Sequence, residues 1–232
     1  MINKRIIVAI DSNNLNKSID LVKTLKNEVY GFKIGYEFFF NFGIIGYKKI
    51  KEICPNIFLD MKLHDIPNTV NNGIIAINKL KPLLTTIHIS GGDEMMKQTR
   101  VSNKFTKILG VSILTSMDSK QTKKYYNSKN VTMLVKKLAK EAKKNKLDGI
   151  VCSPKEIKII RKELGKKFLI ITPGIRLLKN IKMKDDQKRI LTPAKAIELG
   201  ADLLVIGRPI TQSKNPLKIV KEINTSLIKN DY

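Results

Sequence analysis

Short apolar runs rich in β-branched residues alternate along this chain with longer segments of helical periodicity. The strand-like runs cover residues 6–10, 31–35, 57–62, 85–90, 108–114, 149–153, 168–173 and 202–207. The segments between them carry apolar residues three and four positions apart, as in Val70, Ile74 and Ile77. Eight strand–helix units of this kind predict an α/β protein, a (β/α)8 TIM barrel.

Prolines and a glycine mark where the predicted helices begin and end. Pro67, Pro154 and Pro193 stand where first helical turns are expected, and a proline there costs no intrahelical hydrogen bond. Gly200 follows the last residues of a predicted helix, as a helix-ending glycine does. No Pro/Gly/Ser-rich linker divides the chain, so residues 1–232 are expected to form a single barrel domain. The same alternation permits an open doubly wound sheet, and the strand count favours closure.

Charge is the most unusual feature of the composition. The 232 residues include 44 Lys plus Arg against 20 Asp plus Glu, a formal net charge of +24. Lysines are spread along the chain, with the densest stretches at 136–146 and 179–189. This spread favours a solvated surface over a specific nucleic-acid site, although a basic nucleic-acid-binding protein remains an alternative from another class.

The cysteine content and the lengths of the apolar runs indicate the cellular compartment of the protein. Cys54 and Cys152 form no C-x-x-C pair, which is typical of a reducing compartment. The N-terminal apolar run, residues 6–10, is too short for the core of a signal peptide, and no run approaches a membrane span. We expect a cytoplasmic protein with no membrane partner.

Polar residues gather at the predicted strand ends, where a barrel of this class builds its active site. They are Asp11, Lys33, Asp60, Lys62, His88, Ser90, Thr115, Ser116, Gly207 and Arg208. A single strand-end carboxylate is more often a helix cap or a solvated group. Their accumulation at one end of the fold favours a functional site.

The segment 58–70 carries the sharpest chemical pattern. Side chains alternate along a strand, so Asp60 and Lys62 are expected on the same side of the third strand. Asp65 follows just past the strand end, and a second carboxylate near the same lysine exceeds what a simple ion pair needs. A lysine held between carboxylates stays protonated and can donate a proton.

Gly207 and Arg208 follow the eighth strand directly, where barrels commonly bind phosphate. A glycine there would let an anion approach the backbone, and an arginine would offer a bidentate fork. The pair therefore predicts a phosphate site.

The segment DMKLHDIPNT at residues 60–69 closely resembles the signature of orotidine 5'-phosphate decarboxylases. Other landmarks of that family have similar counterparts in the same order: VAID at 8–11, FKIG at 32–35, ILTS at 113–116, ITPGIR at 171–176, DQKR at 186–189 and VIGR at 205–208. The resemblance runs from about residue 6 to 215. It implies a cofactor-free homodimeric barrel that converts orotidine 5'-phosphate to UMP and carbon dioxide in pyrimidine biosynthesis, without a metal.

The resemblance also implies a role for each matching residue. Lys62 would donate a proton to C6, with Asp60 beside the scissile carboxylate and Asp65 reaching in from the partner subunit. The substrate-binding set would be Asp11 and Lys33 on the ribose, Thr69 from the partner, Thr115 and Ser116 on the pyrimidine, and Arg176, Gln187, Gly207 and Arg208 on the phosphate side.

The sequence differs from the family pattern in one loop, and a related class of barrel enzymes shares part of its signature. The family usually has proline and glycine in the phosphate loop, but residues 177–186 contain neither, which puts lid dynamics in doubt more than the chemistry. Magnesium-dependent barrels such as 3-keto-gulonate 6-phosphate decarboxylase or hexulose-phosphate synthase share an Asp-x-Lys-x-x-Asp pattern and remain an alternative. Residues 66–69 and the Gln187 region favour the nucleotide substrate.

Overall fold

The strands form one closed parallel barrel in which neighbours in sequence are neighbours in space. The computed structural model describes residues 4–101, 105–176 and 191–228. The strands are β1 (Ile6–Ile10), β2 (Gly31–Ile34), β3 (Ile57–Leu63), β4 (Leu84–His88), β5 (Lys107–Val111), β6 (Gly149–Val151), β7 (Leu169–Thr172) and β8 (Leu203–Ile206). Ile7 of β1 pairs with Val205 of β8, so the sheet closes on itself. The predicted barrel is confirmed, and the open-sheet alternative is wrong.

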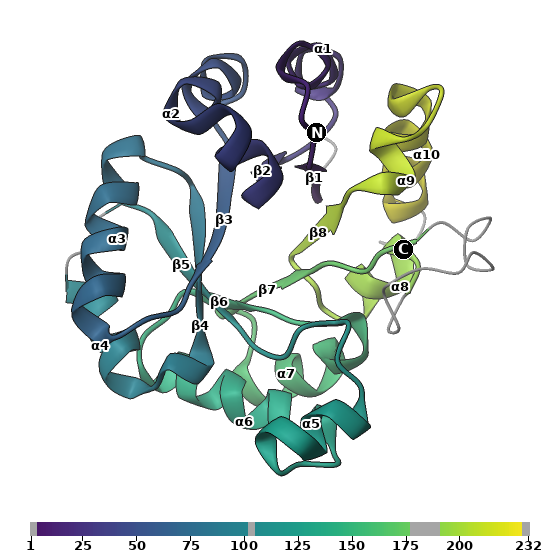
Figure 1. Ribbon diagram of the computed structural model, residues 1–232. Helices are drawn as coiled ribbons and strands as arrows, with labels where there is room; N and C mark the ends of the chain where they lie inside the picture. The colour runs from purple at the N-terminus through teal and green to yellow at the C-terminus, as the bar shows by residue number, and fades with distance from the viewer. Residues whose placement is uncertain (1–3, 102–104, 177–190, 229–232) are drawn as a thin grey trace.

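Helices surround the strands on the outside (Figure 1). They are α1 (Leu15–Leu25), α2 (Tyr36–Ile53), α3 (Pro67–Leu80), α4 (Asp93–Val101), α5 (Ser119–Tyr126), α6 (Val131–Lys144), α7 (Ile157–Leu164), α8 (Pro193–Glu198), α9 (Arg208–Thr211) and α10 (Pro216–Ile228). Short 3-10 turns, η1 (Ile89–Gly91) and η2 (Pro154–Glu156), follow β4 and β6. Helix α2 is kinked at Gly43, which has φ +55°.

The core has two layers because strand side chains point alternately to the two faces of the sheet. Residues facing the helices, such as Ile6, Val8 and Ile10 of β1, pack against helix residues in one large cluster. Ile7 and Ala9 point to the barrel interior and pack with interior residues of the other strands. The next interior position along β1 is Asp11, so the interior becomes charged at its carboxyl end.

The predicted helix signals are largely correct. Pro67 and Pro193 are the first residues of α3 and α8, and Gly200 lies just past α8 with φ +106°. Pro154 differs, because it begins a 3-10 turn and α7 starts only at Ile157.

Several predicted strands run too far at their carboxyl ends. For example, β5 ends at Val111 and not at Leu114, because the following residues leave the ladder and line a cavity. Ile113 and Leu114 therefore line the cavity although they lie outside the strand, and Ile113 also packs into the hydrophobic core.

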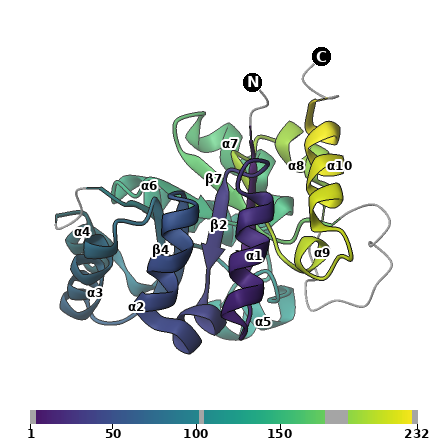
Figure 2. The same ribbon diagram turned by 90° about the horizontal axis from the view of Figure 1, so that it is seen from above.

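The ring of helices closes where α10 packs beside α1, far away in sequence (Figure 2). Asn224 of α10 donates a hydrogen bond to the carbonyl of Glu28 at 2.8 Å across this junction. In the described part of the chain, no helix is long and apolar enough to cross a membrane.

Candidate active site

A cavity of about 570 Å³ opens at the carboxyl end of the barrel. Eight of the residues predicted for the site line it: Asp11, Lys33, Asp60, Lys62, Thr115, Arg176, Gly207 and Arg208. They come from β1, β2, β3, the β5 and β7 loops and the start of α9. The fold thus brings to one place residues that lie almost two hundred positions apart.

Acidic and basic groups alternate along one side of this cavity. Lys33 Nζ lies 3.3 Å from Asp11 Oδ1 and 3.6 Å from Asp60 Oδ2, and Lys62 Nζ lies 2.7 Å from the same Asp60 oxygen. We call Asp11, Lys33, Asp60 and Lys62 the charged row. Each cation faces a carboxylate, so the row is nearly neutral before a substrate arrives.

Asp60 is the most buried member of the charged row, with 6% of the residue exposed. Burial alone would raise the pKa of its carboxyl group. The positive charges of Lys33 and Lys62 and the hydrogen bonds from Lys62 and Thr86 outweigh burial, and the pKa of Asp60 lies below its ordinary value. Thr86 Oγ1 donates to Asp60 Oδ1 at 2.8 Å. Asp60 is therefore a fixed carboxylate at neutral pH.

Asp60 and Lys62 meet as predicted, but the strand between them is not regular. The register of β3 against β4 shifts between Leu59 and Leu63, and Lys62 has φ +44°, in the left-handed region. The regular alternation of side chains, from which we predict that Asp60 and Lys62 are close, therefore does not hold at Lys62. A bulge orients the lysine against its own strand's carboxylate.

Gly35 leaves space for the first ion pair of the charged row. A Cβ atom at this position would lie 2.8 Å from Lys33 Nζ and 3.0 Å from Asp11 Oδ1. Both distances are too short for a carbon next to charged atoms, so a side chain here would push the pair apart.

Two arginines also line the cavity, one from the loop after β7 and one at the start of α9. Arg176 is buried, with its guanidinium donating to the carbonyl of Ile175 at 3.0 Å, and Arg208 is exposed at the start of the short helix α9. Gly207 precedes it and also lines the cavity. Guanidinium groups bind anions through paired hydrogen bonds, so a cavity lined by these arginines and by the charged row suits an anionic ligand.

Three of the predicted site residues that the structure describes do not line this cavity. Asp65 and Thr69 are exposed outside its lining, and Asp65 Oδ1 accepts a hydrogen bond from the Ile66 amide at 2.6 Å. Asp60, not Asp65, is the carboxylate against Lys62 within this chain. Ser116 is exposed beyond Thr115 and does not line the cavity. Gln187 and the predicted lid at 177–186 lie outside the described residues.

Sequence reasoning missed several residues that line or support the site. Glu37, Cys152 and Gln212 line the cavity. Gln212 follows Arg208 by one helical turn, a spacing that could have indicated it. Thr86 contacts the charged row from β4, and no local pattern signals a contact that depends on strand register.

His64 and His88 contact each other near the charged row, with ring centroids 5.3 Å apart. Burial, followed by the charges of His64 and Lys62, lowers the pKa of His88, so its imidazole is neutral at pH 7. Among the described residues, no group of three or more His, Cys, Asp or Glu is placed to hold a metal ion.

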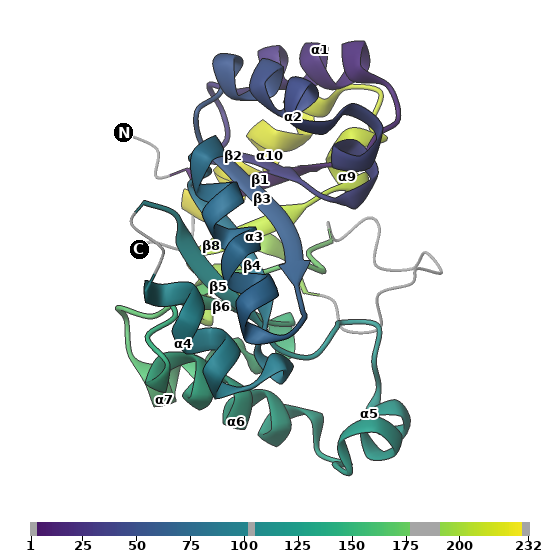
Figure 3. The same cartoon turned by 60° about the vertical axis from the view of Figure 1, so that its left-hand side comes forward.

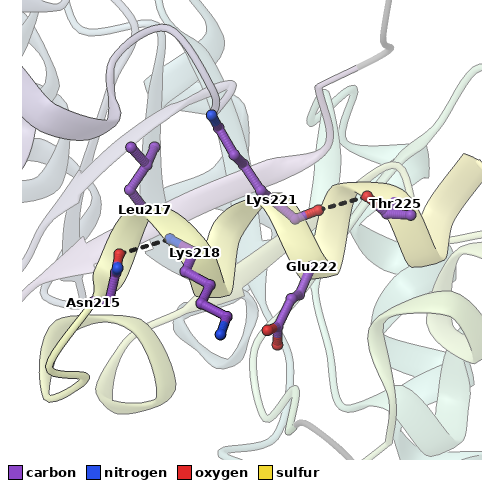
Figure 4. Close-up of a pocket in the computed structure, with 6 residues that line it drawn as sticks. All are labelled: Asn215, Leu217, Lys218, Lys221, Glu222 and Thr225. Atoms are coloured by element: carbon purple, nitrogen blue, oxygen red, sulfur yellow. Dashed lines mark hydrogen bonds between the residues drawn. The ribbon is translucent and has the colours of Figure 1, made fainter.

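A second hollow lies on the outer surface along α10 (Figure 4). Two hydrogen bonds drawn there belong to the helix itself: Asn215 Oδ1 accepts from the Lys218 amide, and Thr225 Oγ1 donates to the Lys221 carbonyl. Cap and backbone bonds of this kind build a helix, so this hollow offers no arrangement comparable with the charged row.

The closed barrel, with its charged cavity at the carboxyl ends of the strands, defines a (β/α)8-barrel enzyme site. A model of the orotidine 5'-phosphate decarboxylase / HUMPS family matches residues 4–223. The chain belongs to this family.

Individual relatives cover nearly the whole chain. The orotidine 5'-phosphate decarboxylase of Wolbachia pipientis subsp. Culex pipiens (strain wPip) is 44% identical, over 96% of this chain and 98% of that protein. The one from Ehrlichia chaffeensis is 41% identical, over 99% of both. The crystal structure of the Lactobacillus acidophilus enzyme has a TM-score of 0.82 at 34% identity, covering 97% of this chain and 99% of that one.

Proposed function

We propose that this protein decarboxylates orotidine 5'-phosphate to UMP and carbon dioxide in pyrimidine biosynthesis, without a cofactor. The observation that carries the proposal is the charged row in a cavity that Arg176 and Arg208 also line. In this proposal the whole chain, residues 1–232, acts as one barrel domain.

The chemistry requires electrostatic stabilisation. When the bond from C6 to the carboxylate breaks, its electron pair stays on C6 in the plane of the ring, where the π system cannot delocalise it. The Lys62 ammonium, fixed against Asp60 at 2.7 Å, stabilises that charge and then donates its proton to C6. Asp60 lies beside the departing carboxylate and keeps the lysine in place.

The remaining contacts bind and orient the nucleotide. Asp11 and Lys33 hold the ribose hydroxyls, and Thr115 with Ser116 meets the pyrimidine edge. Arg176, Gly207, Arg208 and Gln187 receive the phosphate. Phosphate contacts far from C6 supply binding energy that helps to hold the reacting end in place.

The active site is proposed to be shared between two copies of the chain. Asp65 and Thr69 are exposed and lie outside their own cavity. Large apolar side chains are also exposed on α2 and directly before α3, among them Phe40 (76% exposed), Ile44 and Ile66. Figure 3 turns the side of the molecule that carries α2 and α3 toward the viewer. Such a surface suits a twofold partner that receives Asp65 and Thr69 into its cavity.

To test the reaction, the protein is incubated with orotidine 5'-phosphate in the presence of EDTA, and the loss of the substrate's ultraviolet absorbance is measured. Turnover that survives EDTA is expected. No turnover by folded protein would refute the proposed function, and turnover that EDTA abolishes would indicate the magnesium-dependent class of barrel reactions. RNA retardation that persists near physiological salt would support the nucleic-acid alternative, whereas its loss there would leave only non-specific attraction.

Mixing two inactive variants tests the shared site. Lys62→Ala and Asp65→Ala homodimers should each be nearly inactive. After subunit exchange, each hybrid dimer carries one site with both defects and one with neither, so about a quarter of all sites should recover. Mixtures that stay inactive after demonstrated exchange would place Asp65 in its own chain's site.

The proposed location is the cytoplasm. Cys54 and Cys152 are buried thiols that form no disulfide, which suits a reducing compartment.

A further inference from the structure

The peptide group between Met61 and Lys62 is held by side chains and lies between the paired positions of β3 and β4. Its N–H donates to Thr86 Oγ1 at 2.8 Å, and its carbonyl accepts from the Tyr36 hydroxyl at 3.0 Å. The ladder with β4 pairs Leu59 and then Leu63, so the peptide group lies inside the register shift. Two elements distant in sequence, the start of α2 and the middle of β4, therefore fix it.

This peptide group precedes a strained residue. Lys62 has φ +44°, in the left-handed region that residues other than glycine rarely occupy. Such a conformation persists only where its surroundings over-determine it. The hydrogen bonds from Tyr36 and to Thr86 are contacts of this kind, because they bind both polar groups of the peptide.

Tyr36 also contacts the other end of Lys62. The Lys62 ammonium lies 5.6 Å from the centre of the Tyr36 ring, within the range of a cation–π contact. Burial, followed by the negative charge of Asp60, raises the pKa of the Tyr36 hydroxyl, so it remains a hydrogen-bond donor throughout the neutral range. A single side chain thus touches both the backbone and the charged group of the same lysine.

We propose that Tyr36 is a positioning residue that holds Lys62 in its left-handed conformation and aims its ammonium along the charged row. Tyr36 does not touch the reacting atoms in this scheme. It acts through the lysine, and its loss should lower kcat more than it raises KM. The kinetic part of this inference rests on the proposed decarboxylation.

Two substitutions separate the two contacts. Tyr36→Phe removes only the hydrogen bond to the Met61 carbonyl and should lower kcat about tenfold, near the upper end of what one neutral hydrogen bond supplies. Tyr36→Leu also removes the aromatic ring and should lower kcat by roughly another tenfold. KM for orotidine 5'-phosphate should change by no more than about twofold in Tyr36→Phe, since the ligand contacts are intact.

Tyr47 provides a matched control on the same helix. Its hydroxyl donates to the Leu80 carbonyl at 3.2 Å, and Lys51 Nζ lies 5.8 Å from its ring centre, away from the cavity. Tyr47→Phe makes the same chemical change and should leave kcat per folded molecule unaltered. Circular dichroism and light scattering of each variant check folding and assembly.

The outcomes separate this inference from the proposed function. If the wild type turns over and Tyr36→Phe has wild-type kcat, or only a raised KM, the positioning role is overturned. If the wild type does not turn over this substrate, the proposed function fails and crystal structures decide the inference. In a crystal structure of Tyr36→Leu, the φ angle of Lys62 should move away from +44°, or its ammonium should lose contact with Asp60. Retention of both features would overturn the role.

Discussion

Asp60 and Glu163 are each held between two lysines, but only Asp60 lies in a cavity. Glu163 on α7 contacts Lys136 and Lys140 of α6 at 2.6 and 2.5 Å, distances shorter than those around Asp60. Hydrogen bonds from these two lysines lower the pKa of Glu163 to about 2. The pKa of Asp60 is lowered as well, but against the rise that its burial causes.

The difference teaches that burial, more than contact distance, separates the two groups. Water and salt screen the exposed Glu163 contacts, and exposed ion pairs usually add little to the free energy of unfolding. Asp60 has lost most of its hydration, so removal of one partner would leave an uncompensated charge in the cavity. Glu163 links two surface helices, whereas Asp60 contacts two cations that line the cavity.

The largest expected effect comes from Lys62→Ala, which removes one of the two lysines that contact the buried Asp60. Turnover of orotidine 5'-phosphate should fall by several orders of magnitude while substrate analogues still bind, because the lysine acts mainly on charge that appears in the transition state. Lys140→Ala at Glu163 serves as the control and should retain normal turnover. Near-normal activity of Lys62→Ala would remove this lysine from its assigned role.

A smaller effect is expected at Arg208, which also lines the cavity. Arg208→Ala should raise KM for the phosphorylated substrate about 10- to 100-fold, since a charge-assisted hydrogen bond contributes about 1.5 to 3 kcal/mol. Steady-state kinetics with dephosphorylated orotidine should hardly change. An equal loss on both substrates would mean that Arg208 does not bind phosphate.

Support of the charged row can be tested through Thr86, a buried threonine that bonds both Asp60 and the Lys62 amide. Thr86→Val should lower the free energy of unfolding by about 2 kcal/mol, because it leaves buried polar groups without their partner. Thr99 is equally buried, but its hydroxyl bonds the Met96 carbonyl of its own helix. Urea unfolding should find Thr99→Val less destabilised, and equal losses would contradict a special role for Thr86.

The smallest effect concerns acid stability at the exposed site. The lowered pKa of Glu163 contributes stability that is present above its unfolded value of about 4.5 and is lost as pH falls toward about 2. Glu163→Gln should flatten the pH dependence of urea unfolding in this window at low salt and have little effect at high salt. For Asp60 the sign is the same: its contribution is lost as pH falls through its lowered pKa, and salt should screen it less.

Much of the site follows from local patterns. Asp11 and Asp60 follow short apolar runs, Lys33 lies within the second strand, and Gly207 with Arg208 directly follows the last run. In a barrel of parallel strands, such residues must meet at one rim, whatever the details of their packing. Phe38 and Phe40 lie on different faces of their helix: Phe38 is buried and Phe40 is 76% exposed.

Contacts that depend on register could not be predicted in this way. The bulge at Lys62, and the bonds to it from residues about 25 positions away on either side, arise only when β3 is aligned with β4 and α2 is packed beside it. The same applies to Asp65. From its position just past the strand, it could reach either the cavity of its own chain or that of a partner.

The sequence by itself determined the order of strands and helices and the polar residues at the strand ends, because periodicity and strand-end position are local properties of the chain. The strand count favoured a closed barrel, and the pairing of β1 with β8 decided it. Only the tertiary structure decided that Lys62 adopts a left-handed conformation, that Asp60 keeps its charge in spite of burial, and that Tyr36 contacts both ends of the lysine. These features depend on distances and on solvent exclusion between elements far apart in sequence, which no local pattern encodes.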